Sequence, residues 1–271
     1  MIFFRFFKQG FAFLLCLLML LSSAFAQISP PGMGDAQTAS WFAIGARQDL
    51  NSKKSWQSMT YIGLGRKSNP DNTNLLYKPA MVVLNQEFYH PFAKNWQTSV
   101  AVSYRRQQEY AAAAPYLETH PQLQQEFRVY GRIAKSFAVK WFRITPTLRQ
   151  EIRRFFTPDF TNSAEPLQLR SRFRLQLATP LDPKKKHKIT ISSEQLLSTS
   201  QANTSRKWST FAYKESRFML YYSYSPSTLP WTFDIGYMNN LIKEDASTSS
   251  MVHYLAFDLI LKNPFGHSTA P

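Results

Sequence analysis

The chain has 271 residues, of which 44% are hydrophobic and 15% aromatic, and it carries a formal net charge of +15. That length suits one large domain, and the single cysteine excludes a disulfide framework and a thiolate metal site. The basic residues are spread along strand-like segments without a recognised nucleic-acid-binding motif, so we expect no nucleic-acid partner.

Residues 1–26 have the pattern of a secretory signal peptide. Two basic residues open the segment, an apolar run covers 11–21, and the ending "AFA" has the small-x-small form that a signal peptidase recognises. An uncleaved membrane anchor is the alternative, although the apolar run is short for a spanning helix. We expect cleavage before Gln27, which removes Cys16 and leaves an exported mature chain without cysteine.

The mature chain begins with a leader over 27–39, which we expect to be flexible, and continues as a series of strand-like runs. These runs have the period-two alternation and the β-branched and aromatic content of strands, whereas helix signals are absent. No segment after the signal approaches the roughly 18 apolar residues of a spanning helix, so the mature chain could cross a membrane only as a closed barrel. The runs cover 40–48, 56–66, 80–89, 95–106, 121–133, 138–154, 166–178, 187–197, 211–225, 230–242 and 251–262.

The connections between the runs alternate in length. Compact turns such as "HPFAKN", "AKS", "PLDPKKK" and "SPSTLP" alternate with longer polar segments such as "KSNPDNTNLLY", "EYAAAAPYLETH", "FTPDFTNSAE" and "STSQANTSR". Outer-membrane barrels have this pattern, with short periplasmic turns and long external loops. Because bacterial single-chain barrels have even strand numbers, we predict an all-β fold: a single antiparallel transmembrane β-barrel of 12 strands over 40–265, with a C-terminal tail over 266–271.

Twelve strands would require one more strand than the runs provide. We expect it in the leader or within 198–212, and a barrel of ten strands is the alternative. The sequence contains no internal repeat and no second domain boundary.

The segment "LQLRSRFRLQL" (167–177) shows how the two faces of the strands differ. Four leucines and a phenylalanine alternate with three arginines and two glutamines. An arginine that faces lipid near the bilayer midplane costs about 2 to 4 kcal/mol, so the charged face must line the lumen and the apolar face must contact acyl chains. The expected luminal network, a candidate anion path, comprises Glu126, Arg128, Arg132, Arg149, Glu151, Arg153, Arg170, Arg172, Arg174, Glu194, Glu215 and Arg217.

Tryptophans near the predicted strand ends are candidates for an interfacial girdle, because amphipathic rings favour the headgroup level. They are Trp41, Trp56, Trp96, Trp208 and Trp231. The alternative to a membrane barrel is a soluble periplasmic β-barrel or β-sandwich, in which the apolar face would turn inward and the polar face would meet water.

Five short motifs occur in an order that resembles one protein family: "QQEFRVYGRI", "LRQEIRRFF", "LRSRFRLQL", "SSEQLL" and "KESRFMLYYSYS". Over about residues 38–265 the chain resembles a bacterial outer-membrane β-barrel family that is catalogued as a domain of unknown function. The resemblance implies a barrel with no assigned reaction and no catalytic residues, in which the Glu and Arg of these motifs occupy luminal positions. The chain departs from the family pattern at "KES" (214–216) and in its extension beyond Phe265.

No catalytic or cofactor motif accompanies these features. The five histidines are scattered without metal-ligand spacing, and the chain lacks both a G-x-S-x-G elbow and a Gly-rich phosphate loop. We therefore expect no metal site, no cofactor and no enzyme activity.

The sequence predicts an outer-membrane protein that is structural or forms a narrow pore. Fixed arginine rings would favour anions in such a pore. The alternative is an outer-membrane lipid-modifying enzyme, whose site would assemble from separate strands. The expected partners are membrane lipids and the outer-membrane assembly machinery, and the sequence indicates no protein partner.

Overall fold

The computed structural model describes residues 28–243 and 249–266. The expected signal peptide, residues 1–26, and nearly all of the expected tail, residues 267–271, lie outside this described part of the chain. Every regular element within the described residues is a β-strand. These residues contain no helix that is long and apolar enough to cross a membrane. The fold is all-β, as the alternation predicts.

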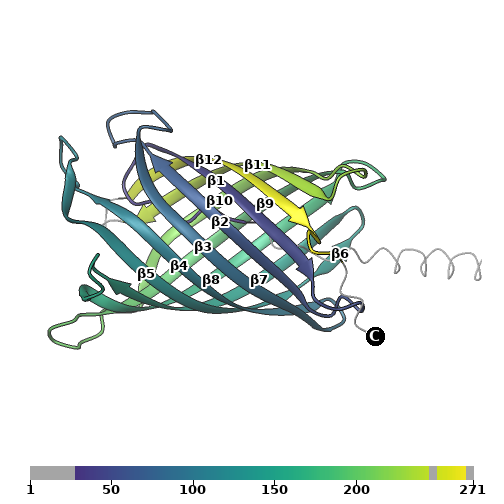
Figure 1. Ribbon diagram of the computed structural model, residues 1–271, viewed down its shortest axis with the longest axis horizontal. Helices are drawn as coiled ribbons and strands as arrows, with labels where there is room; N and C mark the ends of the chain where they lie inside the picture. The colour runs from purple at the N-terminus through teal and green to yellow at the C-terminus, as the bar shows by residue number, and fades with distance from the viewer. Residues whose placement is uncertain (1–27, 244–248, 267–271) are drawn as a thin grey trace, which may run out of the picture.

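The described residues form twelve strands, which Figure 1 shows as a tilted, twisted wall. Each predicted run overlaps one long strand, because alternating β-branched, aromatic and polar residues suit a pleated sheet with two different faces. The strands are β1 Thr38–Asp49, β2 Gln57–Lys67, β3 Lys78–Ala93, β4 Trp96–Tyr110, β5 Glu118–Lys135, β6 Phe137–Val139, β7 Phe142–Phe156, β8 Asn162–Pro180, β9 His187–Gln201, β10 Ala212–Tyr224, β11 Trp231–Lys243 and β12 Ser249–Lys262.

All the strands except β6 form a closed barrel. Consecutive wall strands are antiparallel, β5 pairs with β7, and β1 closes the barrel by pairing with β12. The β1–β12 pair is parallel, from Thr38↔His253 to Arg47↔Lys262. Eleven strands that alternate in direction leave the first and the last pointing the same way, so the closing pair has to be parallel.

The prediction of twelve antiparallel barrel strands was wrong in both the count and the closing pair. The eleven predicted runs already correspond to all eleven wall strands. The twelfth strand was added only because antiparallel closure needs an even number of strands, whereas a parallel closing pair allows an odd number. The short β6 does not supply it, since it pairs only with β7 and continues the register of β5. The described leader contains no strand before β1, and 202–211 contributes only the isolated bridge Gln201↔Trp208.

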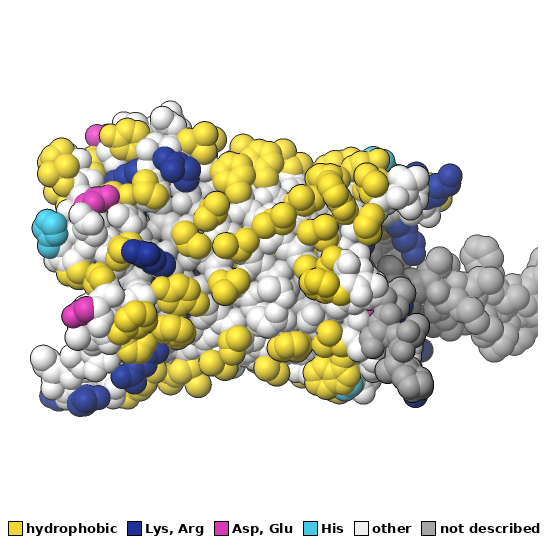
Figure 2. Space-filling view, in the orientation of Figure 1, with side chains coloured by type: hydrophobic (Ala, Val, Ile, Leu, Met, Phe, Trp, Pro, Cys, Tyr) yellow, Lys and Arg dark blue, Asp and Glu magenta, His cyan; other side chains and the backbone are white. Residues whose placement is uncertain are grey.

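An apolar belt surrounds the outside of the barrel. Figure 2 shows hydrophobic side chains across the middle of one face of the wall, with Lys and Arg gathered toward its ends. The charged neighbours of the belt residues point inward, so the alternation predicted the two faces of the charged strands correctly. This orientation is the reverse of the one described for the soluble alternative, in which the apolar face turns inward and the polar face meets water. The belt includes one exposed residue from each wall strand: Ile44, Ile62, Leu84, Val100, Val129, Ile152, Phe173, Ile191, Leu220, Ile235 and Phe257.

The two ends of the barrel carry different connections. All four of the longer polar segments recognised in the sequence lie at the end where β1 begins, which we call the loop end. All four compact turns lie at the opposite end, the turn end, to which the arrowheads of β1 and β12 point at the right of Figure 1. The length alternation in the sequence therefore corresponds to the two ends of the barrel.

The interior has two unlike walls. One wall, formed mainly by β1, β2 and β10–β12, is lined by small and apolar side chains such as those of Ala39, Trp41, Met59, Met238 and Tyr254. The other wall, formed by β4, β5 and β7–β9, is lined by arginine and glutamate. An eleven-stranded barrel is wider than the roughly eight strands whose side chains alone fill the interior, and the leader occupies part of the remaining space.

Candidate functional site

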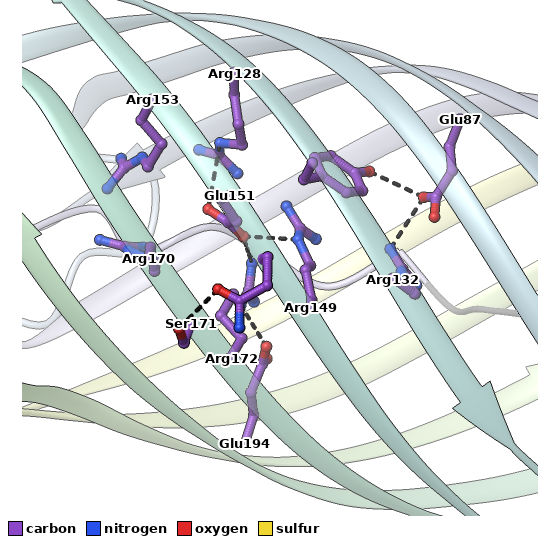
Figure 3. A network of polar contacts seen from close by, with 12 residues as sticks. Glu87, Arg128, Arg132, Arg149, Glu151, Arg153, Arg170, Ser171, Arg172 and Glu194 are labelled. Atoms are coloured by element: carbon purple, nitrogen blue, oxygen red, sulfur yellow. Dashed lines mark hydrogen bonds and ion pairs between the residues drawn. The ribbon is translucent and has the colours of Figure 1, made fainter.

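Glu151 on β7 is the centre of the charged wall (Figure 3). Its Oε1 lies 2.7 Å from Nε of Arg149 and 3.0 Å from Nη1 of Arg172, and its Oε2 lies 3.7 Å from Nε of Arg128. The sheet register aligns these residues. Glu151 on β7 lies opposite Tyr130 of β5, and Arg149 on β7 lies opposite Arg172 of β8. Three cations from three strands therefore share one buried carboxylate.

Glu126 on β5 forms a second centre nearer the loop end. Arg153 binds it with two parallel bonds, Nε to Oε1 and Nη2 to Oε2, both 2.8 Å long. Nη2 of Arg105 lies 2.8 Å from Oε2, and Nη2 of Arg128 lies 2.7 Å from Oε1. Bidentate, charge-assisted pairing of this kind is what the planar guanidinium group does best.

Three further glutamates extend the network around the barrel. Oε1 of Glu194 on β9 lies 2.5 Å from Nε of Arg172. Oε2 of Glu87 on β3 accepts bonds from Arg132 at 3.0 Å and from the Tyr130 hydroxyl at 2.9 Å. Glu215 on β10 pairs with two arginines, Arg217 at 2.9 Å and Arg170 at 3.6 Å.

All twelve residues of the expected luminal network point into the barrel, and eleven of them take part in its ion pairs. Arg174 is the exception, since its Nη1 donates instead to Oγ of Ser29 in the leader at 3.1 Å. The sequence reasoning missed Glu87 and Arg105. Glu87 alternates correctly with its neighbours but belongs to no Arg-rich motif, and Arg105 is followed by Arg106, so alternation did not decide which of the two faces inward.

The network is strongly positive for a buried site. It contains five glutamates and nine arginines, which are eight in ion pairs and Arg174. Every glutamate is therefore neutralised, and guanidinium charge remains in excess. Such an interior can attract and stabilise anions.

The leader is held inside the barrel by polar contacts with both walls. The Met33 N–H donates to the Tyr254 hydroxyl at 2.9 Å, and Lys67 Nζ donates to the Met33 carbonyl at 2.9 Å. Arg217 Nη1 donates to the Pro30 carbonyl at 3.3 Å. From Gln37, which binds Ser68 at the loop end, the leader runs back toward the turn end as far as the described residues extend.

Two glycines provide close approach between the leader and the wall. A Cβ on Gly65 of β2 would collide with the Met33 side chain, so this glycine leaves the space that Met33 fills. A Cβ on Gly32 would lie 3.0 Å from Arg217 Nη2 and 3.2 Å from Glu215 Oε2. Ile28, Met33 and Ala36 of the leader are buried in the same cluster as the apolar wall.

Four of the five expected interfacial tryptophans lie at the ends of the barrel, and one lies inside it. Trp41 instead points into the barrel and is fully buried, because β1 is apolar on both faces and alternation there did not separate inside from outside. Trp56, Trp96 and Trp231 lie at the turn end, where the exposed Trp141 joins them, and Trp208 lies at the loop end. The sequence analysis did not single out Trp141.

The site offers little of the chemistry that enzymes use. Among the described residues there is no group of three or more His, Cys, Asp or Glu that could hold a metal ion. Eight of the nine arginines are paired with glutamate, and the residues of the network include no nucleophile beside a general base. What the network does supply is guanidinium charge in excess of carboxylate charge.

Fold and site together define a closed β-barrel with a buried, arginine-rich network and a leader packed inside it. The chain matches the sequence model of a family described as "Protein of unknown function (DUF2490)" over residues 38–251. Since the match covers more than half of the chain, the protein belongs to this family. No curated protein matches the chain.

Proposed function

We propose that the protein is an outer-membrane β-barrel whose lumen is a narrow, anion-favouring pore that the leader closes. The observation that carries the proposal is the excess of arginine over glutamate in the buried network, nine against five. Fixed guanidinium groups in an enclosed passage lower the energy of an anion and raise that of a cation.

The apolar belt supports a membrane location. Soluble monomers rarely expose a continuous apolar patch larger than a few hundred Å². Here every wall strand exposes large apolar side chains, and the wall strands have 11 residues or more, enough for the roughly 9 to 11 residues of a tilted crossing. Membrane lipids are the partners that fit this surface. The signal peptide and the assembly machinery of the outer membrane would deliver the exported chain there.

The turn end has the composition of a membrane–water boundary. Its connections carry seven lysines, and four tryptophans lie at the same end. Tryptophan favours the headgroup level and lysine is attracted to anionic headgroups. We infer that the turn end faces the periplasm, as short turns do in outer-membrane barrels. The lysines are Lys53, Lys54, Lys94, Lys140, Lys184, Lys185 and Lys186.

The leader accounts for a closed resting state. Its described residues lie between the apolar wall and the charged wall, and a cavity of only about 60 Å³ remains beside them. A cavity of this volume holds a few water molecules. Passage of a solute would require the leader to move.

Planar-bilayer recording tests this proposal. The mature chain should be silent or open rarely, whereas a variant that lacks residues 28–36 should conduct steadily, with a reversal potential in a salt gradient that indicates anion preference. Cation preference, or silence of a leader-deleted variant that still shows heat-modifiable gel mobility, would rule out the pore. Silence combined with lipid turnover would favour the enzyme alternative. Recovery of the protein as a free periplasmic species would rule out the membrane location.

A further inference from the structure

The small cavity between the leader and the charged wall has more cations than anions in its lining. Ile28, Ser29 and Pro31 border it on the leader side. The wall contributes six arginines and two glutamates, Glu87 and Glu194. Its electrostatic character is therefore set by guanidinium groups. The six arginines are Arg128, Arg132, Arg149, Arg172, Arg174 and Arg217.

The two glutamates are already engaged by other donors. Both oxygens of Glu87 accept hydrogen bonds, Oε1 from Ser99 and Oε2 from Tyr130 and Arg132. Glu194 Oε1 is bound to Arg172. Little carboxylate charge is left in the cavity to balance Arg174.

Arg174 differs from the other arginines of the cavity, because two of its buried nitrogens lack a hydrogen-bond partner among the described residues, whereas Arg132, Arg149 and Arg217 each lack one at Nε alone. Among the described residues it has no carboxylate within ion-pair distance, and its Nε and Nη2 are buried without a hydrogen-bond partner there. Glu194 faces it across the β8–β9 register but directs Oε1 to Arg172. A buried guanidinium with unsatisfied N–H groups is costly, and an anion beside it would supply the missing charge and acceptor.

We propose that this cavity binds a small monovalent inorganic anion of the size of chloride, held by Arg174 and the neighbouring arginines. The proposal deepens the proposed function, since it names the ion class and the residue that holds it. The cavity has room for an ion of the size of chloride. One wall of the site is the leader itself, through Ser29 and Ile28, so the bound anion and the closed leader stabilise each other.

The competing occupant is water. Glu194 Oε2 also lacks a partner among the described residues, and a water molecule could bridge it to Arg174. The two occupants differ in a measurable way. If an anion occupies the site, the stability of the folded protein rises with the concentration of that anion. If water occupies it, the stability is the same in every salt at equal ionic strength.

The test compares the mature protein, folded in detergent, in sodium chloride and in sodium gluconate at equal ionic strength. We expect the thermal unfolding midpoint to be higher in chloride by about 2 to 4 °C, and we expect the folded protein to broaden the chloride NMR line. Arg174→Gln should abolish both effects, Arg174→Lys should weaken them, and Arg154→Gln, a change of the same kind on the exposed outer face, should leave them intact.

Equal midpoints in the two salts with no line broadening, or a chloride effect that persists in Arg174→Gln, would overturn the anion site. If Arg174→Gln fails to fold, the salt comparison and the line width of the unaltered protein still decide. The readouts are equilibrium measurements in detergent. They therefore stand apart from bilayer conductance: if the leader-deleted barrel is folded but silent and the mature protein still responds to chloride, the pore is rejected while the site is kept.

Discussion

Single residues inside this barrel carry consequences that their sequence position alone does not reveal. Arg172 has arginines two residues to either side along β8, yet it alone bridges Glu151 and Glu194. Buried pairs of this kind contribute little net stability compared with apolar packing, but removing one partner leaves an uncompensated charge in a dry interior. The position of an arginine in the network therefore decides the cost of losing it.

Arg172→Gln should lower the free energy of unfolding by about 3 to 5 kcal/mol, because two buried carboxylates lose a partner at once. Urea unfolding of the detergent-folded protein measures the change. The double variant Arg172→Gln/Glu194→Gln should recover part of the loss, since Glu194 then carries no charge and Glu151 keeps Arg149 and Arg128. Arg154→Gln on the outer face is the control, with an expected effect within about 0.5 kcal/mol. A single variant as stable as the parent would contradict the assigned network.

Gly63 on β2 is required by its distance from Trp41. A Cβ at this position would collide with the buried indole ring, so Gly63→Ala should destabilise the barrel by about 1 to 3 kcal/mol through overpacking. Gly131→Ala is a matched control, because the nearest atom to its Cβ would be the Ser99 carbonyl oxygen at an ordinary 3.8 Å. Comparable urea midpoints for the two variants would show that Trp41 does not occupy the space above Gly63.

At the scale of elements, the leader is the segment whose role the sequence hid. Its residues 28–37 form neither helix nor strand, and no local pattern distinguishes a flexible tail from a segment packed inside a barrel. The information lies in the wall. Gly65 makes room for Met33, and the apolar side chains of β1, β2 and β10–β12 are buried partly by contact with leader residues. In the sequence, the available sign of a segment packed inside the barrel was that these strands are apolar on both faces.

The strands themselves were predictable, and the reason is physical. Over 167–177 of β8, leucine and phenylalanine alternate with arginine and glutamine, with Ser171 the one interruption of the apolar set, and one orientation of the strand satisfies both sets. The number of strands was not predictable from the same pattern. Local alternation is identical whether a barrel closes with an antiparallel or a parallel pair, because the β1–β12 contact joins residues more than 200 positions apart.

If the lumen is the proposed pore, a disulfide between the leader and the wall should hold it closed. A Cβ on Gly32 would lie 3.5 Å from Nδ2 of Asn240 on β11, so Gly32→Cys/Asn240→Cys places two thiols close enough to test, in a mature chain that has no other cysteine. Voltage-driven openings should disappear when the variant is oxidised and return on reduction. Gly32→Cys alone, treated in the same way, is the control. Unchanged openings in a variant with a verified cross-link would mean that the leader does not close the lumen.

The molecule as a whole combines an apolar exterior with an interior that is charged on one side. That inversion of the usual globular arrangement is what the proposed membrane location would stabilise, because large exposed apolar patches are rare on soluble monomers. An outward arginine near the middle of the wall should therefore be far more damaging in a membrane than in solution.

Phe173 lies near the centre of β8 and is exposed on the belt, so Phe173→Arg places a charge against acyl chains at a cost of about 2 to 4 kcal/mol. Leu181→Arg, the same kind of change in the exposed β8–β9 turn, should be tolerated because the turn lies at the rim. The yield of heat-modifiable protein in outer-membrane fractions measures both. Equal yields would mean that the belt does not contact hydrocarbon, since water screens an arginine equally well at either position.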